Sequence, residues 1–187
     1  MADKRIAIFI DGGYFAKVLR EEFENVRVDF GQLAERVAGG IDILRTYYYD
    51  CMPYQSSSPT PEERERYSGH RRFVSALERI PRFQVRLGKL AFRGVRDDGT
   101  PIFEQRQVDI LLGVDLALLA AKHQITNAAL VSGDSDFLPA VRAAKDEGVL
   151  ISLFHGSDLP PHRELWETAD ERTAFTREFM DSVRLKR

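Results

Sequence analysis

The chain has 187 residues, 43% of them hydrophobic and 30% charged, which is enough to bury the core of one globular domain. Its single cysteine, Cys51, excludes a disulfide within this chain and a zinc site built on cysteine pairs. The N-terminal residues lack the pattern of a signal peptide, and the most apolar run, 108–121, is too short to cross a bilayer. We therefore expect a cytoplasmic protein without a membrane span.

The net charge of −2 conceals an uneven distribution of charged residues. Residues 60–96 contain ten Lys or Arg and four Glu, so this basic segment is positive in an otherwise acidic chain. Such a segment suits a polyanionic partner such as nucleic acid. The alternative is a solvated helix face with local ion pairs, because "PEERERY" itself mixes both signs.

In the first half of the chain, strand patterns alternate with helix patterns. The β-branched run 5–10 ends at Asp11-Gly12-Gly13 and predicts a buried strand that meets a turn. Apolar residues at helical spacing predict a helix from about residue 14, and a second helix over 30–37. The expected elements that follow are a strand over 41–50, a loop over 51–61 rich in proline and serine, and a helix over 62–80.

The second half continues the alternation. Residues 82–94 predict one or two strands, with "RDDGTP" as a turn before "IFEQRQ". The segment 107–123 is apolar almost all round and predicts a largely buried helix. A strand over 127–133, a helix over 135–148, a strand over 149–156 and a tail of two short helices complete the chain. This order predicts an α/β fold with a mainly parallel sheet covered on both faces.

Four aspartates lie where this fold would place a ligand. Asp11 follows the first strand, and Asp134 and Asp136 follow the strand over 127–133. Ligands of parallel sheets bind beyond the carboxyl ends of the strands, so these acids should be close together if their strands are neighbours. Asp109 lies near the start of the apolar helix, where an ionised carboxylate is costly unless it is paired. Each acid also fits a structural role as a helix cap or a partner of the helix dipole.

An acidic pocket of this kind favours a metal ion. Carboxylates that converge would raise each other's pKa unless a cation neutralised them. A set of oxygen ligands without cysteine or closely spaced histidines favours Mg²⁺ or Mn²⁺ over zinc. Such an ion can activate water and stabilise the leaving oxygen of a phosphodiester. Asp115 lies six residues after Asp109, on a different face of the helix, so we expect it to have a supporting or structural role.

Three segments, "IAIFIDGGY", "RQVDILLGVDLALLA" and "ALVSGDSDFLPAVRAAKDEGVLISLF", resemble the NYN domain family (LabA-like), a branch of the PIN-like nuclease superfamily. The resemblance implies a three-layer α/β/α sandwich with a central, mainly parallel sheet, and an acidic edge that binds Mg²⁺ or Mn²⁺ for RNA cleavage. The residues that it implies as metal ligands and catalytic groups are Asp11, Asp109, Asp134 and Asp136.

The match to the family also covers other positions. Asp115 matches a further acid of the helix motif, and Arg106 matches the basic residue that usually precedes "VD". Tyr14 is a departure, because many members of the family have Asn at this place. The departure bears on how water is positioned at the metal and does not affect the expected fold.

The leading hypothesis is a metal-dependent ribonuclease in which Ser132 supports the ligands through a hydrogen bond. The residues expected to contact RNA phosphates are Arg82, Arg86, Lys89, Arg93 and Arg106. An RNA-binding or regulatory module that does not cleave is the alternative, which Tyr14 supports, and a phosphatase acting on small phosphoesters is the third hypothesis. We place the domain at 1–157, with a hairpin insertion around 82–103. The tail 158–187 is expected to pack on the domain or at a contact with a second copy.

Overall fold

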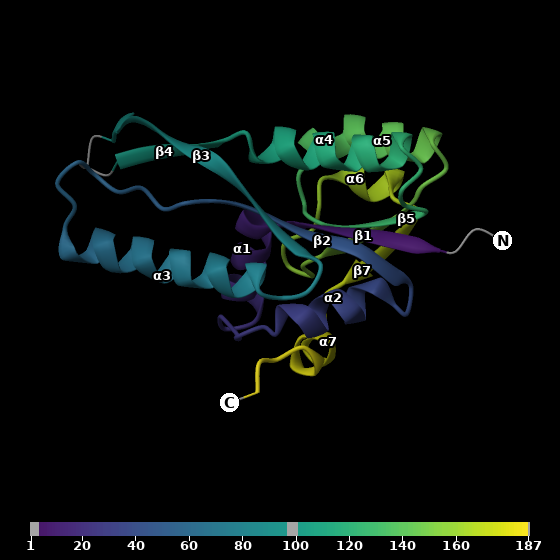
Figure 1. Ribbon diagram of the computed structural model, residues 1–187, viewed down its shortest axis with the longest axis horizontal. Helices are drawn as coiled ribbons and strands as arrows, with labels where there is room; N and C mark the ends of the chain where they lie inside the picture. The colour runs from purple at the N-terminus through teal and green to yellow at the C-terminus, as the bar shows by residue number, and fades with distance from the viewer. Residues whose placement is uncertain (1–3, 97–100, 187) are drawn as a thin grey trace.

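A single mixed sheet between two layers of helices organises the computed structural model, which describes residues 4–96 and 101–186 (Figure 1). The strand order is β4-β3-β2-β1-β5-β6-β7. In this spatial order, β3, β2, β1, β5, β6 and β7 are each parallel to the next strand. The β3–β4 pair at the edge is antiparallel. The expected α/β class with a mainly parallel sheet is therefore confirmed.

The strands and helices alternate along most of the chain. The strands are β1 (Arg5–Asp11), β2 (Asp42–Cys51), β3 (Phe83–Val95), β4 (Pro101–Arg106), β5 (Asn127–Val131), β6 (Leu150–His155) and β7 (Glu171–Ala174). The helices are α1 (Gly12–Glu22), α2 (Phe30–Ala38), α3 (Pro61–Glu78), α4 (Val108–Ala121), α5 (Leu138–Asp146), α6 (Arg163–Thr168) and α7 (Arg177–Ser182), with a 3₁₀ turn η1 (Ser135–Phe137).

The central strand β1 is apolar on both faces, and this explains the two helical layers. Ile8 and Ile10 belong to a core under α1, α2, α3 and α7, whereas Phe9 packs into a core under α4, α5 and α6. Because side chains alternate along a strand, a continuous run of large apolar residues requires cover on both sides. The three-layer sandwich follows from this requirement.

Polar caps define where the first three helices begin. The Asp11 and Asp29 side chains accept hydrogen bonds from backbone amides in the first turns of α1 and α2. Thr60 and Glu63 form a reciprocal capping box at the start of α3, with Pro61 in its first turn. The helix boundaries therefore follow from local side-chain chemistry that the sequence displays.

The burial of α4 differs from the expectation. Ile110 is 67% exposed, and Val114 and Leu118 are each 48% exposed, so the prediction of a largely buried helix is wrong. The buried residues of this helix form the stripe Val108, Leu112, Leu116 and Ala120, which packs into the core. A helix at the edge of a layer buries one side alone, and uniform apolarity does not indicate which side that is.

The tail also differs from its predicted form. Between α6 and α7 it contributes β7, which pairs in parallel with β6, whereas two helices alone were expected. The segment Glu171–Ala174 has mostly exposed side chains and lacks the apolar alternation that identifies a strand. The domain boundary at residue 157 stays a prediction.

The predicted hairpin around 82–103 is formed by β3 and β4. The first half of β3 pairs with β2 in the sheet, and its second half, from Lys89 onward, pairs with β4. Residues 97–100, which include most of the predicted turn, lie outside the described residues. Among the described helices, none has the length and apolarity that a membrane crossing requires.

Candidate metal centre

The acidic residues gather where the strand order reverses. The strand β1 lies between β2 and β5, so the chain continues to one side of β1 in its first half and to the other side afterwards. Ile10 of β1 is in register with Val131 of β5, and both strands end at the same edge. Such a reversal opens a crevice beyond the carboxyl ends of the strands. The expectation that Asp11 lies near the loop after β5 is confirmed.

Asp11 is fixed in this crevice by two hydrogen bonds. Its Oδ1 accepts from the Tyr14 backbone N–H at 3.0 Å, and its Oδ2 accepts from the Ser132 hydroxyl at 3.2 Å. The pKa of Asp11 is raised to about 6, mainly by burial and to a smaller extent by the charges of Asp109 and Asp134, against the lowering effect of the two hydrogen bonds. The fold therefore keeps a carboxylate at a position where its charge is costly.

Ser132 connects the two strand ends. Its buried hydroxyl donates to Asp11 and accepts from the backbone N–H of Asp134 at 3.2 Å. The Asp134 side chain in turn accepts from the backbone N–H of Asp136 at 3.0 Å and caps η1. Capping thus accounts for one oxygen of Asp134, while its exposed carboxylate keeps further oxygen lone pairs for a ligand.

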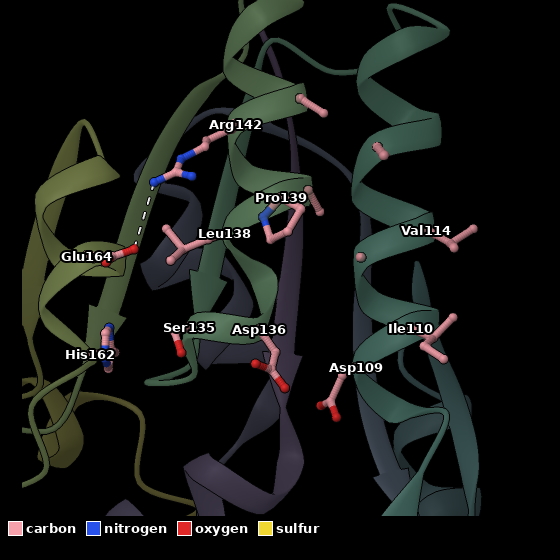
Figure 2. Close-up of a pocket in the computed structure, with 14 residues that line it drawn as sticks. Asp109, Ile110, Val114, Ser135, Asp136, Leu138, Pro139, Arg142, His162 and Glu164 are labelled. Carbon is pink, nitrogen blue, oxygen red and sulfur yellow. Dashed lines mark ion pairs between the residues drawn. The ribbon is translucent and has the colours of Figure 1, made fainter.

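Asp109 approaches from the other side of the crevice. It lies in the first turn of α4 and is not the cap, because Gln107 occupies that position without a side-chain hydrogen bond. Burial and the charges of Asp134 and Asp136 raise the pKa of Asp109. Figure 2 shows the carboxylates of Asp109 and Asp136 pointing toward one another from α4 and η1. The structure therefore brings all four predicted acids to one edge.

These acids do not form a closed cage for an ion. In the part of the chain that the structure describes, no three His, Cys, Asp or Glu side chains are arranged to hold one metal. Mg²⁺ keeps several waters, however, and commonly binds through one or two carboxylates together with substrate phosphates. The oxygen donors and the raised pKa values of Asp11 and Asp109 fit an ion bound in this open manner.

Two hollows meet at the acidic centre. One, of about 440 Å³, is lined by Asp11, Lys17 and Asp134 among others. The other is a groove of about 1060 Å³ between α4 and α5 that begins at Asp109 and Asp136 (Figure 2). Ser135 and His162 line both hollows. A substrate can therefore reach the acids from two sides.

Three residues that line these hollows, Tyr14, Lys17 and His162, were not predicted as parts of the site. The Tyr14 hydroxyl donates to the Leu159 carbonyl at 2.6 Å and accepts from the Gly156 backbone N–H at 3.0 Å. Tyr14 thereby fixes the loop after β6 beside the acids, and this loop leads to His162. Lys17 follows one turn later on α1 and adds a cation. The sequence pointed to Tyr14 alone, through its departure from the Asn of the family. The hydrogen bonds that hold the loop join residues more than 140 positions apart in the sequence, so local patterns could not reveal them.

Asp115, which was predicted to have a supporting or structural role, joins the helix to two strands. It accepts a hydrogen bond from the Tyr49 hydroxyl at 2.9 Å and forms an ion pair with Arg86 at 3.2 Å. It lines neither of the two hollows. Asp115 therefore fastens α4 to β2 and β3, at a distance from the acids that face the crevice.

The residues predicted to contact phosphates are spread over β3 and β4. Arg82 precedes β3 at the amino edge of the sheet, where it pairs with Asp42 at 2.8 Å. Arg86 is held by Asp115, whereas Lys89 and Arg93 are exposed on the outer half of β3. Arg106 ends β4, and its side chain lies outside the described residues. Among the described side chains of this set, none of Arg82, Arg86, Lys89 and Arg93 lines the two hollows at the acidic centre.

Comparison with known proteins agrees with this architecture. The family model of the NYN domain matches residues 5–174. The chain belongs to the NYN domain family. Its core is the nuclease-like, PIN-like α/β fold of that family, with both strands of the acidic edge inside the matched range.

Two solved structures are also similar to this NYN protein. A Vibrio parahaemolyticus protein of unknown function matches with a TM-score of 0.66 and 20% identity, over 98% of this chain and 97% of that chain. This likeness supports the fold alone. Acinetobacter baumannii MurG matches with a TM-score of 0.41 and 13% identity, over 92% of this chain and 43% of MurG, which is too weak a likeness to support a conclusion. No curated protein matches the sequence.

Proposed function

We propose that this NYN protein is a ribonuclease that hydrolyses RNA phosphodiester bonds with a bound Mg²⁺ or Mn²⁺. The observation that carries the proposal is the gathering of Asp11, Asp109, Asp134 and Asp136, from three separate segments, at the point where the strand order reverses. Membership of a nuclease-like family supports the same reading. A cytoplasmic location suits a chain with one cysteine.

In this proposal each acid has a defined part. Asp11 and Asp134 would hold the ion from the two strand ends, and the Ser132 hydroxyl positions the Asp11 carboxylate and the backbone of Asp134. Asp109 and Asp136 face each other on the exposed side, where they would hold water molecules beside the ion. When bound, the ion supplies an acidified water and stabilises charge on the leaving oxygen.

The cations around the acids serve the substrate. Lys17 lines the same hollow as Asp11 and Asp134, so its ammonium group can hold a phosphate of the strand beside the acids. His162 lies between the two hollows and is placed to donate to a phosphate or a sugar hydroxyl. The two open hollows leave room for a polymer on either side of the reacting bond.

Cleavage of a labelled single-stranded RNA in Mg²⁺, Mn²⁺ or EDTA tests the proposal. Asp134→Asn is the central variant, because Asn can still cap η1 through its side-chain oxygen while it loses the charge. Asp146→Asn is the matched control, since it removes the same charge at the far end of α5. We expect metal-dependent cleavage by the wild type and the control, and a loss of about 100-fold or more in Asp134→Asn.

Three other results would each contradict the proposal in a different way. Intact RNA in every condition, with salt-sensitive binding retained, would indicate a binding module that does not cleave. Hydrolysis of p-nitrophenyl phosphate with intact RNA would indicate a phosphatase. Equal cleavage by wild type and Asp134→Asn would remove the acids from the reaction.

A further inference from the structure

The helix α3 has two chemically different faces. Its inner face packs on the sheet through Val74 and Leu77, which are buried. Its outer face carries Ser68, Arg71, Arg72, Ser75 and Arg79, which together line a surface depression of about 560 Å³. Ser68, Arg72, Ser75 and Arg79 recur at intervals of three or four residues, and Arg71 lies next to Arg72, so the set follows one side of the helix. We call this set the arginine stripe.

The charges of the arginine stripe are not neutralised within the described residues. All three guanidinium groups belong to exposed residues, and none of the ion pairs of segments 4–96 and 101–186 includes them. By contrast, Arg82, just before the neighbouring β3, and Arg86, within it, are paired with aspartates. The stripe therefore concentrates like charges that an anionic partner would offset.

We propose that the arginine stripe binds the phosphate backbone of RNA, at a surface separate from the acidic centre. Guanidinium groups bind phosphate in a planar, bidentate manner, and serine hydroxyls between them can donate to further phosphate oxygens. Arg71 and Arg79 are separated by about 12 Å along the helix axis. That span exceeds what a single phosphate can bridge and suits a chain of repeating phosphates.

The composition of the stripe also indicates that it would bind a nucleic acid without recognising its base sequence. Its depression is lined by arginine and serine alone, without an aromatic side chain for stacking on bases. Contacts of this kind position a nucleic acid and carry no sequence information. A membrane surface is less suited, because no large apolar side chain lines the depression to enter the lipid.

The stripe lies apart from the place of proposed chemistry. None of its residues lines the two hollows at the acidic centre. In Figure 1, α3 covers the face of the sheet opposite to α4 and α5. The stripe therefore contributes affinity for the substrate chain and not the cleavage step. That the polyanion is RNA rests on the function proposed above.

Salt-dependent binding of an oligouridine of about 20 nucleotides tests this inference. All proteins carry Asp134→Asn and are measured in EDTA, so that binding is recorded without cleavage. The stripe variant is Arg71→Gln/Arg72→Gln/Arg79→Gln, and the matched control is Arg20→Gln/Lys122→Gln/Arg177→Gln, which removes the same charge from exposed positions on α1, α7 and the end of α4. A third variant replaces the three stripe arginines by lysine.

Loss of three phosphate contacts should reduce the slope of log affinity against log salt by about 2, and weaken binding about tenfold at low salt. We expect the control variant to keep the wild-type slope and the lysine variant to keep most of it. An unchanged slope in the stripe variant, or an equal loss in the control, would overturn the inference. Thermal unfolding of each variant shows whether α3 is intact.

The same series separates this inference from the proposed nuclease activity. If the wild type never cleaves RNA but the salt dependence of binding is reduced in the stripe variant, RNA binding by the stripe is supported and the proposed nuclease activity is contradicted. If the wild type cleaves RNA and the salt dependence of binding is unchanged in the stripe variant, only the proposed binding role of the stripe is contradicted. Vesicles that contain phosphatidylserine provide a second polyanion, and stripe-dependent binding to them with unchanged RNA binding would assign the surface to membranes instead.

Discussion

Replacement of Asp11 by Asn is expected to stabilise the metal-free protein. The substitution keeps the side-chain oxygen that accepts from the Tyr14 backbone N–H, and Asn is as good a helix cap as Asp. The Ser132 hydroxyl can turn to accept from the new amide group. What changes is the charge, which the wild-type protein keeps in a largely buried position near two other carboxylates.

The size of the effect follows from the pKa of Asp11. Burial raises it from 3.8 to about 6, and one pKa unit corresponds to about 1.4 kcal/mol, so the charged form costs roughly 3 kcal/mol of stability. Because the pKa is higher in the folded state, this cost is absent below about pH 4 and develops as the pH rises toward 6. Above pH 6 it is complete. The stabilisation by Asn should follow the same course.

Thermal unfolding between pH 4.5 and 8 in EDTA measures this difference. For a chain of this length, about 3 kcal/mol corresponds to an increase in Tm of roughly 6–12 °C in Asp11→Asn above pH 6, and the increase should decline toward pH 4.5. Addition of Mn²⁺ at pH 7.5 should raise the Tm of the wild type more than that of the variant, because only the wild type keeps the complete ligand set. A lower Tm in Asp11→Asn, or a difference independent of pH, would refute the reasoning.

Two further predictions concern α4 and the loop beside the acids. Leu112→Ala should lower the free energy of unfolding by about 2–5 kcal/mol because Leu112 is fully buried, whereas Ile110→Ala, at a 67% exposed residue, should change it by less than about 1 kcal/mol, as urea denaturation can measure. Tyr14→Phe removes the hydrogen bonds to Leu159 and Gly156, so limited proteolysis should cut this loop faster while the rest of the chain stays protected.

Local sequence signals account for most of the fold. The strand at residues 5–10 with Asp11 after it, and the strand at 127–131 with the "SGDSDF" motif after it, each combine an apolar run with capping chemistry inside a few neighbouring residues. Because those signals are local, the order of strands and helices and the shared edge of Asp11 and Asp134 could be predicted. The family resemblance then indicated the arrangement that the NYN match confirms.

The remaining features depend on contacts between distant segments. Whether an arginine is free to bind phosphate depends on its partner, and sequence alone could not reveal that Asp42 pairs with Arg82 or Asp115 with Arg86. The outward face of α4 and the strand β7 depend in the same way on which neighbour covers them. Periodicity identifies an apolar helix but not the layer in which it lies.

The most direct test of the acidic centre is a parallel titration with Mn²⁺, in which bound metal and the RNA cleavage rate are measured on the same samples. Electron paramagnetic resonance of free Mn²⁺ gives the occupancy, and single-turnover cleavage gives the rate. We predict that the rate rises in proportion to occupancy in the wild type, and that Asp134→Asn loses both at the same Mn²⁺ concentrations. Cleavage that continues in EDTA, or that is unrelated to the amount of bound Mn²⁺, would contradict the proposed metal-dependent reaction.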